Sequence, residues 1–360
     1  MLLTISKGRL DVRSSEDMNI DELCRLKPVL ESSDVITSFI HEHKPKRGIR
    51  RFSFISLLLL YLYMECRKTT YRGIVRNLSD HECVCLGLID DDGHPRRPSY
   101  ATLNWFVNGT LAPMAAAIGD EFAAAVLETM DVSSFTLDST PLQASRYNEG
   151  AVFNPHYNIK MDKSHILMAN GYPLYQIHSD GGANDGPFAA PLIDRLPGAH
   201  FAPGRMGFHT DGGYDSFRTY AQVYLATGAV MRCNQGTNAV CSDVDENVIR
   251  IKYGRMWMRE GYDPHRKNDF DYMLRFLCRH GEEVLVGKHL RDRSMLLSAE
   301  DGSGAKNIRQ VCETMHRAMK RWVDFSIFRL VKRTKEGRVR CRFLCLQLLS
   351  VLFKGYVDIA

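Results

Sequence analysis

The chain has 360 residues, of which 44% are hydrophobic and 25% charged, and its formal net charge is +5. This composition excludes a disordered or fibrous protein, and the length predicts two or three domains in a folded, soluble chain. Because the ten cysteines follow no secretory signal, we expect reduced thiols in the cytoplasm.

Residues 1–130 are predicted to form an all-helical N-terminal domain. Their most apolar run, residues 54–64, is shorter than the roughly 20 residues that span a bilayer, so we expect a buried helix and no membrane association. A basic cluster at 43–51 beside short helices favours a helix-turn-helix DNA-binding domain, with a plain helical bundle as the equal alternative. One histidine and two cysteines within residues 81–85 could form half of a metal site, but no second ligand pair stands at a matching spacing.

From residue 131 the pattern changes to short runs of β type. Strands are predicted at 135–140, 156–161, 172–180, 206–211 and 229–235, with helices at 185–196 and 216–228 between the later ones. Three strands in succession, then helix, strand, helix and strand, predict an α/β sheet with an antiparallel beginning and a parallel remainder over residues 131–235.

The rest of the chain is predicted to hold two segments. Residues 236–303 break the α/β pattern and are interpreted as an insertion, with one helix and one strand, the strand at 282–290. In residues 304–360 a strong helix follows Gly304 and a basic tail comes after it. Between residues 306 and 342, twelve lysines and arginines accompany three acids. Such clustering is typical of contact with a polyanion, and solvated surface charge is the equal alternative.

Three acids stand where they could meet. Asp138 lies on the polar face of its predicted strand, opposite Phe135 and Leu137. Asp211 ends another strand, at the sheet edge where α/β proteins bind ligands. The third acid, Glu313, lies on the polar stripe of the late helix, where by itself it would be an ordinary partner in a salt-bridge ladder. Three converging carboxylates are enough to hold two Mg²⁺ ions for phosphodiester chemistry.

The residues around Asp211 allow several interpretations. Gly212 and Gly213 permit a positive φ and the close approach of a backbone or phosphate. Asp215 or Ser216 can cap the helix that follows. His209 and Tyr214 could support the site from behind, and a packed strand residue is the equal interpretation for His209.

Two further acids follow the third predicted strand. Asp185 matches a recurrent position of the family named below, but we interpret it first as a helix N-cap. Asp180 also precedes two glycines. The strand order excludes it as the second metal ligand, because a helix and another strand are still needed before that ligand.

The motifs carry a resemblance to a known family. "LDST" at 137–140, "TDGGYDS" at 210–216 and "RQVCETMHRAMK" at 309–320 resemble the three acidic blocks of the DDE-type transposases of bacterial and archaeal insertion sequences. The resemblance covers roughly residues 133–325 and extends weakly into the N-terminal third. In one large branch the last block reads Tyr, two residues, Arg, three residues, Glu, six residues, Lys. Arg309, Glu313 and Lys320 fit it, whereas Lys306 stands where tyrosine is expected.

This resemblance implies a fold and a site. The fold would be an RNase H-like mixed sheet with flanking helices, preceded by the all-helical domain and interrupted by the insertion before the last catalytic helix. Asp138, Asp211 and Glu313 would be catalytic and would hold two Mg²⁺ ions, with Mn²⁺ as a substitute. Arg309 and Lys320 would bind DNA phosphates, and we add Arg317 because it shares their helix face.

The implied function is Mg²⁺-dependent cleavage at the ends of a mobile element and strand transfer into target DNA. The implied partners are terminal inverted repeats and target DNA, with the chain acting as a homodimer or higher oligomer in the cytoplasm, at the nucleoid. Two alternatives stay open: an RNase H-like nuclease that cuts without joining, and an inactive or domesticated copy that only binds DNA.

Overall fold

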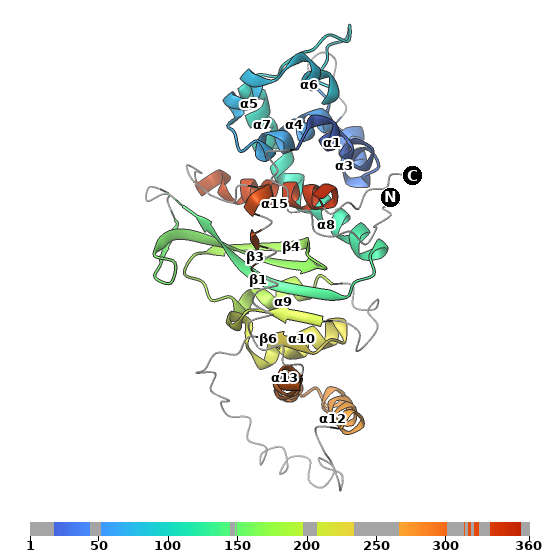
Figure 1. Cartoon of the computed structure of the whole chain (residues 1–360), viewed down its shortest axis with the longest axis vertical. Helices are drawn as coiled ribbons and strands as arrows, with labels where there is room; N and C mark the ends of the chain where they lie inside the picture. Colours follow the sequence, from blue (N-terminus) through green and yellow to red (C-terminus); the bar gives the residue numbers. More distant parts are fainter. Residues whose placement is uncertain are drawn as a thin grey trace.

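The computed structural model describes residues 18–43, 52–144, 148, 150–196, 207–233, 266–300, 313, 316–317, 320–323 and 332–353. Figure 1 shows the elements stacked along the long axis of the molecule. Small N-terminal helices form one end, and helices α8 and α15 lie between them and a central sheet. Helices α9, α10, α12 and α13 follow on the opposite side of the sheet.

The described residues before 130 form helices, as predicted. Seven precede the long helix α8 (Ala112–Thr129): α1 Ile20–Cys24, α2 Leu26–Glu31, α3 Asp34–Glu42, α4 Phe54–Cys66, α5 Tyr71–Asn77, α6 Asp80–Cys85 and α7 Tyr100–Trp105. Most begin at a side chain that accepts a hydrogen bond from the first turn, such as Ser53 for α4 and Ser79 for α6. Helix α4 is buried along nearly its whole length, which confirms the prediction for that apolar run.

A single apolar helix runs from α7 through a π-helical turn, η2 (Phe106–Leu111), into α8. By length and composition Tyr100–Thr129 could cross a membrane, and 44% of its most apolar window is buried. Its second half packs against α15 (Lys332–Phe353) and the sheet. This packing is that of a core helix.

Among the described residues the sheet has six strands: β1 Ser134–Gln143, β2 Val152–Asn154, β3 Ile159–Ala169, β4 Tyr172–Asp180, β5 Gly207–Thr210 and β6 Met231–Cys233. They lie in the order β2-β3-β1-β5-β6, with β4 also paired to β3. The pairs β1/β3 and β3/β4 are antiparallel, whereas β1/β5 and β5/β6 are parallel. The predicted antiparallel beginning and parallel remainder are therefore confirmed, and the short strand β2 is an addition.

Short helices connect the parallel strands. Between β4 and β5 lie η3 (Gly186–Phe188) and α9 (Ala189–Ile193); between β5 and β6 lie η4 (Gly212–Tyr214) and α10 (Phe217–Thr227). Ser216 caps α10 by accepting from the Thr219 amide, so of the two predicted caps it is the serine that acts. Asp215 instead accepts two hydrogen bonds from the Arg291 guanidinium, at 2.9 and 2.8 Å.

The strand predicted at 282–290 is wrong, because this segment begins helix α13 (Glu283–Glu300), which follows helix α12 (Lys267–Arg279). Its β-branched residues suggested a strand. However, Val286 and Leu290, which lie four residues apart and so on one face of a helix, are both buried. The helix packs against α10 and β6. Gly287 allows this close approach, since a Cβ there would collide with the Phe217 carbonyl.

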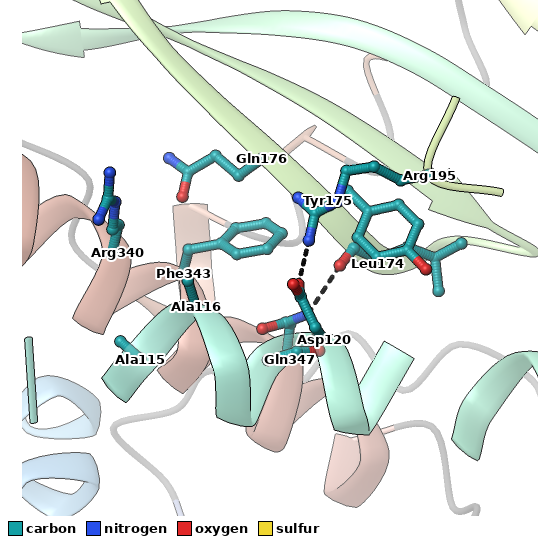
Figure 2. A pocket seen from close by; sticks show the side chains of 11 residues that line it. Ala115, Ala116, Asp120, Leu174, Tyr175, Gln176, Arg195, Arg340, Phe343 and Gln347 are labelled. Atoms are coloured by element: carbon teal, nitrogen blue, oxygen red, sulfur yellow. Dashed lines mark hydrogen bonds and ion pairs between the residues drawn. The ribbon is translucent and has the colours of Figure 1, made fainter. Parts of the chain in front are cut away.

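Helices α8 and α15 cover one face of the sheet through polar as well as apolar contacts (Figure 2). Gln347 of α15 donates to the carbonyl oxygens of Gly119 in α8, at 3.1 Å, and Leu174 in β4, at 2.8 Å. Arg195 pairs with Asp120 at the rim of a small cavity of about 60 Å³ between these elements. The last helix of the chain is thereby joined to both the sheet and the N-terminal helices.

Several cations of the basic tail are already bound within the molecule. Lys335 of α15 is buried and forms an ion pair with Asp162 of β3. Arg338 donates to the Asn104 and Asn108 side chains, and Arg342 pairs with Glu65 of α4 at 3.4 Å. These three cations are therefore not simply solvated surface charges, because acids of α4 and β3 and amides of α7 and η2 bind them. Contact of the basic tail with a polyanion stays a prediction.

Candidate functional site

Two of the predicted acids lie side by side on adjacent strands. Strands β1 and β5 run parallel, and their last paired residues are Leu137 and Thr210. The residue after each is an aspartate: Asp138 stays within β1, paired with Ile166 of β3, and Asp211 directly follows β5, so both acids stand where the parallel pairing ends. Phe135 and Leu137 are fully buried on the opposite face, as the alternation along β1 predicted.

The third acid comes from the late helical segment. Glu313, Arg317 and Lys320 are helical and line one cleft with Asp138 and Asp211, with a volume of about 320 Å³. The rest of its lining is Ser139, Thr140, Pro141, Tyr157, Thr210 and His316. Of the six residues predicted for the site, five therefore meet in one place. The sixth, Arg309, lies outside the described residues.

In the cleft the carboxyl group of Asp138 lies among other acidic side chains. Burial and the neighbouring carboxylates of Asp211, Asp185 and Glu313 together raise the pKa of this carboxyl group to about 7, against the effect of the Ser139 amide. That amide donates to Asp138 Oδ1 at 2.7 Å. With this pKa the carboxyl group is only partly ionised at neutral pH, and a cation beside it would favour the ionised form.

The helix that carries Glu313 also brings a histidine and a lysine to Asp138. His316 Nε2 lies 3.3 Å from Asp138 Oδ2. Burial and the charge of Lys320 lower the pKa of His316 to about 3, so this imidazole is neutral. Burial also lowers the pKa of Lys320, against the attraction of Asp138. The helix thus supplies one acid, one neutral ring and one cation to the same carboxylate.

Asp185 does not act as a helix cap. It stands at the start of η3, but its side chain caps no amide. Instead its Oδ1 accepts from Lys163 Nζ at 3.0 Å and lies 3.7 Å from His165 Nδ1. Both partners project from the same face of β3, because they are two residues apart. The N-cap interpretation is wrong, since the carboxylate turns inward toward this basic pair.

Behind this ion pair lies a buried polar network. His165 Nδ1 is 3.1 Å from the Tyr214 hydroxyl, and its Nε2 is 2.8 Å from the Ser179 hydroxyl. The ring also stacks on Phe188, with centroids 4.2 Å apart. Tyr214 is fully buried just after Asp211, so the network supports the turn that carries the second acid.

Neither glycine after Asp211 adopts the positive φ that the sequence permitted. A Cβ on Gly213 would lie 2.8 Å from Asp185 Oδ2. The backbone at this turn is therefore approached closely by a carboxylate of the protein itself, which a side chain at Gly213 would displace. The predicted approach of a phosphate stays a prediction.

The other nearby candidates are placed clearly. His209 lies within β5, paired with Thr136 and Arg232, and burial lowers its pKa, so it is a packed strand residue. Asp180 ends β4, two strands away from β1 in the sheet, and accepts from the Gly182 amide at 2.9 Å.

Sequence reasoning missed His316 as a neighbour of Asp138, and it missed Lys163 as a partner of Asp185. The alternation of Lys163 and His165, which puts both side chains on one face of β3, was the available signal.

The donor set fits Mg²⁺. Carboxylate oxygens from β1, from the end of β5 and from the late helix line one cleft, and oxygen is the ligand that this ion prefers. Asp138 is also held among like charges that a bound cation would neutralise.

No family model, curated protein or solved structure matches this chain. Function therefore has to follow from the chemistry of the cleft.

Proposed function

We propose that the chain is a metal-dependent DNA-cutting and strand-joining enzyme of the DDE transposase type. The observation that carries the proposal is that Asp138, Asp211 and Glu313, from three distant parts of the sequence, line one cleft together with two cations. The strand arrangement supports an RNase H-like fold, because the antiparallel strands β1 to β4 precede two strands in parallel pairing, with the first acid on β1 and the second directly after β5.

Each group of residues in the cleft would have its own role in the reaction. Asp138, Asp211 and Glu313 would hold the metal ions, which lower the pKa of an attacking oxygen and stabilise a leaving one when bound. Arg317 and Lys320 would bind backbone phosphates beside the cut, which positions the strand without reading its sequence. His316 would pack against Asp138 and fix its orientation.

The reaction would consist of two displacements at phosphorus. In the first, a water oxygen attacks a phosphodiester at the element's end, the bond to the 3′-oxygen breaks, and that oxygen leaves as a 3′-hydroxyl after taking up a proton. In the second, this hydroxyl attacks a phosphodiester of target DNA and releases a new 3′-hydroxyl there. Each step exchanges one phosphorus–oxygen bond for another, and DNA would be the partner of a dimer or higher oligomer, at the nucleoid.

The test supplies Mg²⁺ and a labelled duplex that carries the DNA flanking the gene on each side. Cleavage and joining are expected from the native chain. Asp138→Asn, Asp211→Asn and Glu313→Gln should each abolish both steps and leave DNA binding intact. Full cutting by the Glu313→Gln protein would refute the role of the third acid.

The same assay separates the two alternatives. An RNase H-like nuclease would cut the duplex without joining its ends to target DNA. A decayed or domesticated copy would bind the duplex and do neither. Cutting without transfer, or binding alone, would therefore overturn the proposal.

A further inference from the structure

Three side chains of metal-ligand type, Asp21, His81 and Cys85, meet between helices α1 and α6, at sequence positions far from those of the cleft. Asp21 and Cys24 lie one turn apart on α1, and His81 and Cys85 lie one turn apart on α6. Residues three or four apart share a helix face, and the two helices pack against each other. The further ligand that spacing along the sequence did not reveal is thus supplied by another helix.

The distances within this cluster are those of an assembled metal site. The ligand atoms of Asp21, His81 and Cys85 all lie within 4.8 Å of one another. Cys85 Sγ is 3.7 Å from Asp21 Oδ1 and 3.6 Å from His81 Nε2. In a tetrahedral zinc site, bonds of about 2.3 Å to sulfur and about 2.1 Å to nitrogen or oxygen separate these atoms by about 3.6 Å. Both observed separations agree with that geometry.

Cys24 lies against the same contact between the helices. Its thiol donates to the carbonyl oxygen of Cys85 at 3.2 Å, so its sulfur sits beside the cluster. Asp21 and His81 are exposed, and both cysteines are partly exposed, which leaves the cluster open to an ion from solvent. The ligand set is therefore one thiol, one imidazole and one carboxylate, and the Cys24 thiol beside it is bound to a backbone carbonyl.

We propose that Asp21, His81 and Cys85 bind one Zn²⁺ that links α1 to α6. Thiolate and imidazole ligands select zinc among the common divalent ions, whereas the carboxylate cleft suits Mg²⁺. Three protein ligands leave the fourth tetrahedral position to a water molecule. Helices of five and six residues are too short to be stable alone, and a shared ion holds them in place. This site is independent of the function proposed for the cleft.

The test uses the full chain, stripped of metal by a chelator under reducing conditions and titrated with Co²⁺ as a spectroscopic probe. One equivalent should produce a thiolate-to-cobalt charge-transfer band and the intense visible bands of tetrahedral cobalt, and Zn²⁺ should displace it. A chain that gives no charge-transfer band would overturn the proposal.

Variants assign the ligands. Cys85→Ser should abolish the charge-transfer band and lower Co²⁺ affinity by more than about tenfold. Asp21→Asn and His81→Ala should lower the affinity similarly, and because both residues are exposed these variants keep the packing of the helices. Unchanged affinity in any of the three would remove that residue from the site, and unchanged affinity in Cys85→Ser would end the proposal.

Two controls separate this site from other thiols and from the cleft. Cys278→Ser removes a partly exposed thiol of α12 and should leave the band unchanged. The double variant Asp138→Asn with Asp211→Asn should also keep the band. Loss of the band in either control would place the thiolate-bound ion elsewhere and contradict the assignment.

Discussion

Gly213 lies against Asp185 so closely that a Cβ on the glycine would come within 2.8 Å of Asp185 Oδ2. The same carboxylate binds Lys163 and lies in the electrostatic field of Asp138. The turn after Asp211 is therefore tied through Asp185 to strand β3. A change at one glycine can move both the second acid and the polar network behind it.

Gly213→Ala should displace the Asp185 side chain and shift the turn that carries Asp211. Overpacking of this kind costs about 1 to 3 kcal/mol, and a misplacement of about 1 Å near reacting atoms can cost about 100-fold in rate. We expect the variant to lose most of its rate of DNA cleavage while the free energy of unfolding falls only modestly. Parallel cleavage assays and denaturant titrations measure the two effects.

The matched control is Gly186→Ala. A Cβ on Gly186 would lie 3.6 Å from the Gly213 carbonyl oxygen, an ordinary contact. This variant should cut DNA at nearly the native rate. If both alanine variants behave alike, the contact between Gly213 and Asp185 has no part in the site.

His165 should make the protein less stable in mild acid. Burial lowers the pKa of its imidazole to about 4, whereas an unfolded chain has a value near 6.5. The unfolded state therefore binds a proton that the folded state excludes, and stability falls as the pH drops from about 6.5 to 4. By pH 5 this amounts to roughly 1 to 2 kcal/mol.

The measurement is the free energy of unfolding in urea at pH 7 and pH 5, for the native chain and for His165→Gln. The variant should be less stable at pH 7, because hydrogen bonds to Tyr214 and Ser179 are weakened. It should lose less stability between the two pH values, since no imidazole remains to be protonated at that position. An equal fall in both proteins would show that His165 does not titrate in this range.

Lys335→Met should destabilise the fold strongly. Asp162 is fully buried, and although burial alone would raise its pKa, the contacts with His178 and Lys335 lower it, so the carboxylate is held charged. Removing one partner of a buried ion pair costs about 3 to 5 kcal/mol, and His178, 2.8 Å from Asp162 Oδ2, would offset part of it. Urea denaturation at pH 7 gives the value.

Arg340→Met is the control from the same helix. Arg340 pairs with Glu336 one turn earlier, and both side chains are at least half exposed. Such a pair contributes about 0.3 to 0.5 kcal/mol. A similar loss in the two variants would mean that the buried ion pair does not fasten α15 to the sheet.

Patterns within single strands, together with the order of the strands, predicted the position of the first two acids of the site. Alternation placed Asp138 opposite Phe135 and Leu137, and strand order placed Asp211 at the same sheet edge. The strand predicted at 282–290 failed because its β-branched residues fit either element, and packing against α10 decided for a helix.

Contacts between segments that lie far apart in the chain could not be predicted from the sequence. Nothing near Gly213 indicates that Asp185 will fill the space beside it, and nothing near Lys335 names Asp162 as its partner. The same is true of Asp21, which meets Cys85 only because two short helices pack together. Periodicity predicts which face a residue occupies, and the partner on that face depends on tertiary structure.

Lys320→Ala should weaken DNA binding and reduce its dependence on salt. Lys320 lines the cleft and senses the Asp138 charge, so it stands where a phosphate beside the metal ions would lie. Each lost phosphate contact lowers the slope of log affinity against log salt by about 0.9. Titrations of a labelled duplex at several salt concentrations measure this slope. Arg340→Ala, which removes an exposed cation of α15 outside the cleft lining, should change it less. An unchanged slope in Lys320→Ala would mean that this lysine contacts no phosphate and serves only to balance the charge of Asp138.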